Sequence, residues 1–262
     1  MSQLINIESV IKDKKKDYFK VETTIGDFLI SESMIVKYLI LKGKSFTEEE
    51  FTDILNDISK EKYFSKVLNY ISYQMRSEKE IKDYLFEKEA SYEIVDYVIE
   101  RLKTLNYVND ELLSEIILKE CIKKQKGPKV LENKLFSKGI SSDISQNILK
   151  NYTNDIQNEI IDSIALKFID SNTKLPIKKQ KQKLQSKLMY NGFDSYLVNA
   201  KINSYHYVDE SDEDLKKQVR LLIEKYDNNL NYETKKKIMN KLVLKGYEYQ
   251  KIKESFSSLD DE

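Results

Sequence analysis

Hydrophobic residues recur at helical spacing over most of this 262-residue chain, and a longer repeat is superimposed on that spacing. Four stretches share one order of features: two large apolar residues, a short turn, a capping residue and a second amphipathic helix. They are residues 84–102, 134–152, 187–205 and 241–259. Their anchor leucines, spaced 50, 53 and 54 residues apart, are Leu85, Leu135, Leu188 and Leu242. Self-similarity at a nearly fixed period is the signature of a repeat protein, so we predict tandem repeats.

Each copy continues in the same way after its leucine. The next residue is again apolar and is Phe86, Phe136, Met189 or Val243. Glycine occupies the turn in three copies, as Gly139, Gly192 and Gly246, whereas the first copy has Glu89. A cap-like residue then opens the second helix and is Ser91, Ser141, Asp194 or Glu248. We expect both large apolar residues before the turn, and the apolar stripe after it, to be core.

A further helical stripe precedes each of these stretches, so each repeat is expected to have three helices. The expected repeats are residues 61–109, 110–155, 156–208 and 209–262. A single unit would leave an apolar face uncovered, and stacking of neighbours would bury it. We therefore expect a mainly α fold of tandem three-helix repeats, stacked into an elongated, curved rod.

Local signals mark several helix starts. Ser77 with Glu80, and Ser211 with Asp214, have the spacing of capping boxes. Pro128 suits the first position of a helix, where the missing N–H costs nothing.

Residues 1–60 follow a different pattern. Three short, partly alternating segments predict a small antiparallel β-meander, at residues 4–10, 17–23 and 27–30. A helical stripe then runs from Ser31 to Gly43. Thr47 with Glu50 predicts a capping box that opens a second helix, with Phe46 packing on Phe51 as a hydrophobic staple.

Composition narrows the class of protein. Charged residues make up 34% of the chain, and no apolar run approaches the roughly 18 residues that span a bilayer. The single cysteine, Cys121, cannot form an internal disulfide and suits a reducing compartment, so we expect a cytoplasmic protein. The lone His206 has no cysteine or second histidine nearby, and no Gly-rich phosphate loop is present. We expect no enzyme activity, catalytic residue, metal or cofactor.

Charge is unevenly distributed although 44 basic and 44 acidic residues balance over the chain. Residues 1–110 carry a net charge of −4, residues 111–205 a net charge of +6, and residues 206–262 a net charge of −2. A basic middle between acidic ends is expected if only the middle meets a polyanion.

Two lysine clusters account for the basic middle. The first surrounds the turn at Gly127 and contains Lys123, Lys124, Lys126, Lys129, Lys134 and Lys138. The second contains Lys174, Lys178, Lys179, Lys181, Lys183 and Lys187. Helical spacing places Lys179, Lys183 and Lys187 in one row. Such rows could join into a stripe that binds phosphate backbones without sequence preference, although two solvated helix faces would give the same pattern.

Arginine is scarce, and Arg76 and Arg101 are the other candidate contacts with nucleic acid or a protein filament. A guanidinium pairs bidentately with phosphate or carboxylate, which lysine cannot do. An internal ion pair explains either arginine equally well.

The order of these motifs resembles the RecX family of bacterial recombination regulators. The resemblance rests on the run from Arg76 and Ser77 through Glu80 to Leu85, on residues 102–110, on residues 126–128, and on residues 135–140. It covers residues 61–152 well, and the later repeats look like more divergent units of the same kind. The N-terminal meander resembles the extension of longer family members, and Glu89 departs from the glycine of the other copies.

The resemblance implies a non-enzymatic regulator of the RecA recombinase. Family members lie in the groove of the RecA–DNA filament and restrain its extension, ATP hydrolysis and strand exchange. The implied partners are the filament and, weakly and without sequence preference, single- or double-stranded DNA. We also expect a monomer. The alternative is a helical-repeat scaffold that binds a protein partner without nucleic acid.

Overall fold

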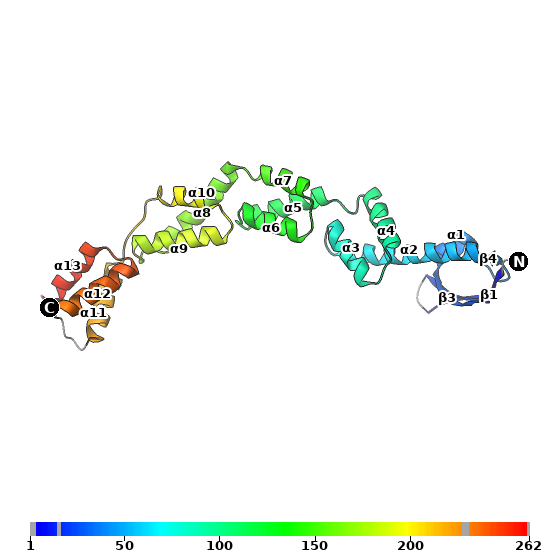
Figure 1. Cartoon of the computed structure of the whole chain (residues 1–262), viewed down its shortest axis with the longest axis horizontal. Helices are drawn as coiled ribbons and strands as arrows, with labels where there is room; N and C mark the ends of the chain where they lie inside the picture. The colour runs from blue at the N-terminus through cyan, green and yellow to red at the C-terminus, as the bar shows by residue number, and fades with distance from the viewer. Residues whose placement is uncertain (1–3, 15–16, 227–230, 261–262) are drawn as a thin grey trace. The chain divides into compact units, whose positions relative to one another are not determined.

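The computed structural model describes residues 4–14, 17–226 and 231–260, with side chains as far as residue 257. Leu259, at the end of the fourth stretch, therefore lies outside the described side chains. The chain forms two compact units, coloured along the chain in Figure 1. One unit is Met1–Leu113 with Lys138–Ile140, and the other is Ser114–Ser137 with Ser141–Glu262.

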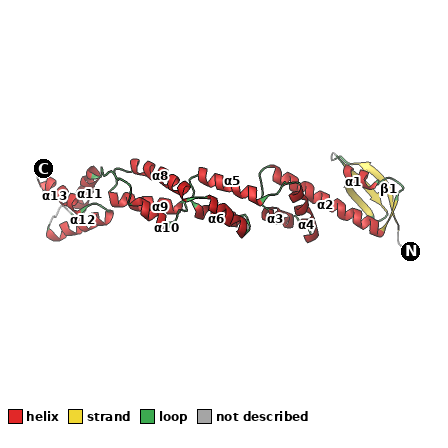
Figure 2. Ribbon diagram, turned by 90° about the horizontal axis from the view of Figure 1, so that it is seen from above, coloured by secondary structure: helices red, strands yellow, loops and turns green. Residues whose placement is uncertain are grey.

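A four-stranded antiparallel sheet begins the first unit, shown in yellow in Figure 2. Its strands are β1 (Leu4–Lys12), β2 (Tyr18–Thr23), β3 (Gly26–Ser31) and β4 (Ser45–Thr47), in the order β3-β2-β1-β4. The three predicted strands are confirmed. The short β4, which pairs with β1 through Ile5 and Phe46, was not predicted.

Two helices cover this sheet, α1 (Glu32–Tyr38) and α2 (Glu48–Ser72). The predicted capping box is present, because Thr47 Oγ1 accepts from the Glu50 N–H and Glu50 accepts from the Thr47 N–H. Phe46 packs on Phe51 with ring centroids 6.1 Å apart, which confirms the staple. The helix α2 runs unbroken past residue 60, so one helix serves both the sheet and the first repeat.

Three-helix repeats make up the remainder. The first adds α3 (Glu78–Glu87) and α4 (Tyr92–Thr104) to the end of α2. The second contains α5 (Asp110–Lys123), α6 (Pro128–Ser137) and α7 (Ser142–Asn151). The third contains α8 (Asn154–Asp170), α9 (Ile177–Tyr190) and α10 (Ser195–Ile202), and the fourth α11 (Asp212–Glu224), α12 (Tyr232–Lys245) and α13 (Tyr249–Asp260). The anchor leucines are fully buried, as predicted.

The prediction that the apolar residue after each anchor leucine is core was wrong for three of the four copies. Phe86, Phe136 and Met189 are exposed, and Val243 is half-buried. Consecutive helical residues point about 100° apart, so a helix that buries its leucine turns the next side chain outward. The second helix of each repeat reaches the core through a single stripe, for example Leu131 with Leu135 in α6.

The predicted capping box at Ser211 was also wrong. Its side chain makes no cap bond, because the Ser211 hydroxyl and N–H both donate to Asp209. Asp214 instead accepts from the Tyr247 hydroxyl. The capping box of Ser77 with Glu80 is confirmed.

Candidate interaction surface of the middle helices

The second helices of the repeats, α3, α6, α9 and α12, are here called the middle helices. In the second unit, the end of α9 contacts the start of α6. The Gly127 N–H donates to the Asn191 carbonyl at 2.7 Å, and the Lys129 N–H donates to the Gly192 carbonyl at 3.1 Å. These bonds satisfy N–H groups at a helix start, which have no partner within their own helix.

The turn after α9 requires glycine at position 192, because the backbone there is left-handed and a Cβ would have no room. Gly192 has φ +91°, and a Cβ there would lie 2.9 Å from the Val130 backbone nitrogen. Within the first unit, Gly139 has φ +69°, and a Cβ there would lie 2.2 Å from Lys79 Cδ. At the same junction, the Ser77 hydroxyl donates to the Lys138 carbonyl at 2.6 Å.

The first repeat has Glu89 where the other repeats have glycine, and the same geometry explains this difference. Glu89 has the left-handed conformation as well, with φ 62°, and it is exposed. No three-helix repeat precedes it, so its turn has no earlier middle helix to approach. The first copy therefore keeps the backbone shape without needing a residue that lacks Cβ.

The first lysine cluster is largely neutralised by the protein itself. Lys138 pairs with Glu80 at 2.9 Å, and Lys126 donates to the Asn191 amide oxygen at 2.9 Å. Lys124 and Lys134 both pair with Glu120. The remaining members are Lys129, which pairs with Asp194 at 3.5 Å, and Lys123, which is exposed with no ion pair among the described residues.

The contacts of Glu80 lower the pKa of its carboxyl. Burial works against ionisation of this carboxyl, but the Ser77 N–H and the Lys138 ammonium outweigh it and hold the pKa of Glu80 below its usual value. Lys138 is therefore a structural ion-pair partner at the junction in the first unit.

The second cluster is different, because most of its lysines are free. Lys178, Lys179 and Lys183 are exposed on α9 and make no ion pair among the residues that the structure describes. Lys187 is also exposed and lies 5.5 Å from the Phe168 ring centroid. Their helix buries Leu184 and Leu188 on its other side.

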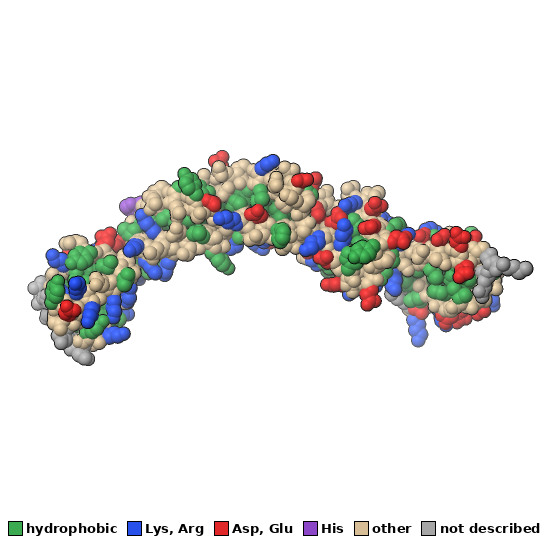
Figure 3. Space-filling model, in the orientation of Figure 1, with side chains coloured by type: hydrophobic (Ala, Val, Ile, Leu, Met, Phe, Trp, Pro, Cys, Tyr) green, Lys and Arg blue, Asp and Glu red, His purple; other side chains and the backbone are tan. Residues whose placement is uncertain are grey.

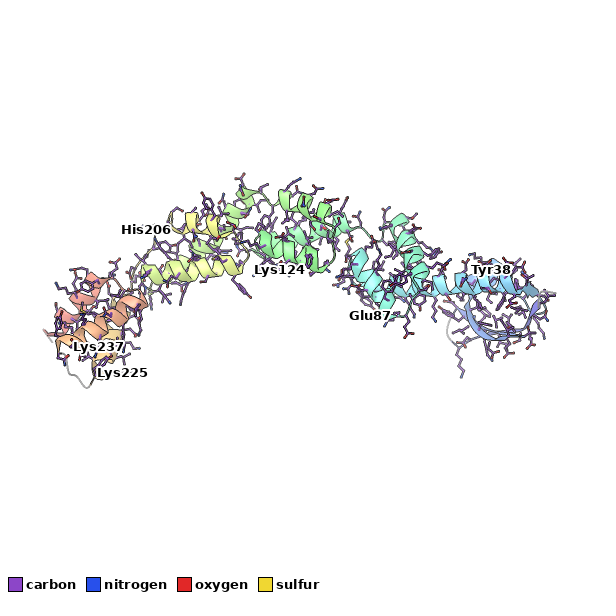
Figure 4. All side chains as sticks on the ribbon, viewed as in Figure 1. Tyr38, Glu87, Lys124, His206, Lys225 and Lys237 are labelled. Atoms are coloured by element: carbon purple, nitrogen blue, oxygen red, sulfur yellow. The ribbon has the colours of Figure 1, made fainter. Side chains whose placement is uncertain are left out.

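The sequence interpretation missed a matching set on α12. Lys235, Lys237 and Lys241 follow Lys181, Lys183 and Lys187 by 54 residues, the interval between the last two anchor leucines. Lys236 and Lys237 are exposed without an ion pair within the described ranges. Basic side chains gather over α12 in Figure 3, and Figure 4 labels Lys237. The signal was available, because lysine directly precedes the anchor leucine in three repeats.

Both candidate arginines make internal contacts in the first unit. Arg76 pairs with Glu80 at 3.4 Å and lies over the Tyr70 ring. Arg101 pairs with Glu61 at 2.6 Å and lies 3.9 Å from the Phe64 ring centroid. The exposed basic side chains without an ion pair among the described residues thus include lysines of α9 and α12, but not these arginines.

The described residues do not indicate a metal site, a reactive thiol or a membrane-spanning helix. No group of three or more His, Cys, Asp or Glu side chains among them could hold a metal ion. Cys121 is buried, and burial raises the pKa of its thiol. Within the same residues, no helix combines the length and the apolar character needed to cross a membrane.

Comparison with known proteins gives consistent matches. Residues 64–102 match the family model described as "RecX, first three-helix domain". The chain is 32% identical over 230 residues to "Regulatory protein RecX" of Listeria innocua, which covers 86% of each chain. It is also 32% identical over 161 residues to the protein of that name from Streptococcus agalactiae, over 58% of this chain and 60% of that one.

Solved structures agree. "Crystal structure of regulatory protein RecX" matches with a TM-score of 0.59 and 25% identity, over 74% of this chain and 97% of that chain. A RecX structure from Lactobacillus salivarius matches with a TM-score of 0.52 and 28% identity, over 55% of this chain and 94% of that chain.

Proposed function

Because the chain belongs to the RecX family of regulatory proteins, we propose that it regulates the RecA recombinase, mainly by restraint. In this proposal the protein binds in the groove of the RecA–DNA filament and limits its extension, its ATP hydrolysis and strand exchange. The lysines of α9 and α12 contact DNA phosphates, and other surfaces of the repeats contact the recombinase.

The observation that carries the DNA contact is the free lysine row on α9. Lys179, Lys183 and Lys187 are four residues apart, so they follow one another by about 6 Å along the helix. A charge that is already paired within the protein must give up its partner to bind a phosphate, whereas these lysines have no carboxylate to give up among the described residues. Each repeat contributes a few weak contacts, and affinity arises from their combination.

The first lysine cluster supports a smaller role in DNA binding than its composition suggested. Lys124, Lys134 and Lys138 have carboxylate partners, which screen their charge. Lys123 and Lys126 have no carboxylate partner among the described residues, and Lys126 donates to the neutral Asn191 amide oxygen.

The regulatory proposal is tested by the single-strand-dependent ATPase activity of the cognate RecA. We expect the protein to lower that activity at stoichiometric amounts. An unchanged ATPase rate, together with unchanged strand exchange, would refute the regulatory role.

The DNA contact is tested by charge reversal of Lys179, Lys183 and Lys187 to glutamate. We expect weaker binding to single-stranded DNA and a salt slope lower by about 2, since each phosphate contact contributes about 0.7. The matched control reverses Lys119, Lys167 and Lys216, which are exposed on the first helices of three repeats. If both variants behave alike, the α9 row is only a solvated face. A wild-type protein that regulates RecA without binding DNA in a gel shift would favour the scaffold alternative.

A further inference from the structure

Each repeat exposes a large apolar side chain at the end of its middle helix. In the second unit, Phe136, Tyr190 and Leu244 are 83%, 83% and 85% exposed. They lie one or two residues after the anchor leucine of their repeat. In the first unit the corresponding side chain is Phe86, which packs edge-on against the exposed Tyr92 at 5.1 Å.

These side chains lie outside the buried core. Residues so exposed add little to the core of their own repeat, which is built on the buried leucines beside them. Single exposed apolar residues are normal on protein surfaces. Recurrence in the last turn of successive middle helices, one or two residues after the anchor leucine, is different, because it places an apolar group beside the same turn each time. Hydrophobic side chains reach the surface over the repeats in Figure 3.

We propose that the turn after each middle helix is a protein-docking point, and that its partner presents the same apolar site at a regular interval. A polymer of identical subunits has that property. This inference rests on the proposed function, in which the partner is the recombinase filament. It assigns the contact with protein subunits to the turns, and it leaves the exposed lysines Lys178, Lys179 and Lys183 of α9 to the nucleic acid.

The residue types favour a protein surface over nucleic-acid bases. Bases stack on aromatic rings, and the exposed set includes Leu244 and the 47% exposed Met189, which have no ring. An apolar pocket on a protein accepts aromatic and aliphatic side chains alike.

Charge defines the partner further. In the third and fourth repeats, the lysine before the anchor leucine lies three residues before the exposed side chain, as Lys187 and Lys241, whereas the equivalent Lys134 of the second repeat pairs with Glu120. In addition, Lys126 Nζ lies 5.5 Å from the Tyr190 ring centroid. An apolar site rimmed by carboxylates complements this arrangement.

A single exposed side chain buries too little area for stable binding, so the docking points must act together. When one turn is seated, the next turn meets its subunit at a high effective concentration. Loss of one anchor is expected to weaken binding about tenfold, and loss of three by more than about 100-fold.

The test uses the full-length protein with Phe136→Ser, Tyr190→Ser and Leu244→Ser combined. The control combines Tyr73→Ser, Leu166→Ser and Tyr232→Ser, which removes two tyrosines and a leucine that are also exposed but lie away from these turns. Binding is measured to the recombinase filament and to naked single-stranded DNA at about 0.1 and 0.5 M salt, since salt screens the lysines and spares apolar contacts. Far-UV circular dichroism checks that both variants are folded.

We expect the turn variant to lose filament binding at both salt concentrations and to retain binding to naked DNA, while the control retains both. If the turn variant and the control bind the filament equally, the docking inference is wrong and the proposed function stands. An equal loss of filament and DNA binding would mean that the side chains stack on bases, which overturns docking on protein. A wild-type protein that does not bind the filament at all would overturn the proposed function and this inference together.

Discussion

Replacing Gly192 with alanine should destabilise the second unit. The residue has φ +91°, and the new Cβ would lie 2.9 Å from the Val130 backbone nitrogen and 2.8 Å from Val130 Cγ2. Backbone atoms at the start of α6 cannot move aside as a flexible side chain could. The Gly127 and Lys129 amides, which donate to the 191 and 192 carbonyls, should lose their bonds as the two helix ends separate.

The magnitude has two parts. A left-handed conformation costs an alanine about 1–2 kcal/mol relative to glycine. Relief of the overlap by backbone displacement costs about 1–3 kcal/mol more. The sum is about 2–5 kcal/mol, which lowers the melting temperature by about 4–20 °C in a chain of this size.

The assay is urea unfolding followed by far-UV circular dichroism, because the chain has no tryptophan. Hydrogen exchange at the Gly127 and Lys129 amides gives a local readout. Glu89→Gly is the matched control: it alters the equivalent exposed turn, where loss of left-handed strain and gain of unfolded-state entropy nearly cancel. An unchanged midpoint and unchanged exchange in Gly192→Ala would refute the close-approach explanation.

Two further predictions concern titratable groups. The folded pKa of Glu80 lies below its unfolded value near 4.5, so its contacts with Ser77 and Lys138 stabilise the fold above that pH and are lost as pH falls through the folded pKa. Glu80→Gln should cost about 1–2 kcal/mol in urea unfolding at pH 7, with the difference from wild type shrinking as pH falls through the folded pKa, and a pH-independent difference would contradict this. Because Cys121 is buried and its thiol pKa is raised, it should react with a thiol reagent such as Ellman's reagent only as the second unit unfolds, and rapid native labelling would show that it is accessible.

Features encoded within a few residues of one another were predicted well. The capping boxes at Thr47 and Ser77 depend on side chains three positions away, and both are present. The recurring leucines identified the buried stripe of each middle helix. The family followed from the order of such local motifs.

Features that depend on distant partners could not be predicted. Pairing of Lys138 with Glu80 joins residues 58 positions apart, so the first lysine cluster looked free when read as sequence. Two adjacent apolar residues do not reveal which one faces inward, and Phe136 was therefore assigned to the core although it is exposed. At Ser211 the nearby Asp209 competed successfully for the hydroxyl, and spacing alone could not show this.

The glycine turns imply a rule for how such proteins gain and lose modules. The second and third repeats bring, in their own turns, the residue that fits the preceding middle helix, as Gly139 does at Lys79 and Gly192 does at Val130, whereas a Cβ at Gly246 would lie 3.5 Å from the Lys179 nitrogen, at ordinary contact distance. The first repeat does not need glycine at this position and has Glu89 there, because no three-helix repeat precedes it. A duplicated unit that carries its glycine can thus be added after the last repeat without any change upstream. Moving the first repeat to an internal position would instead require Glu89 to become glycine.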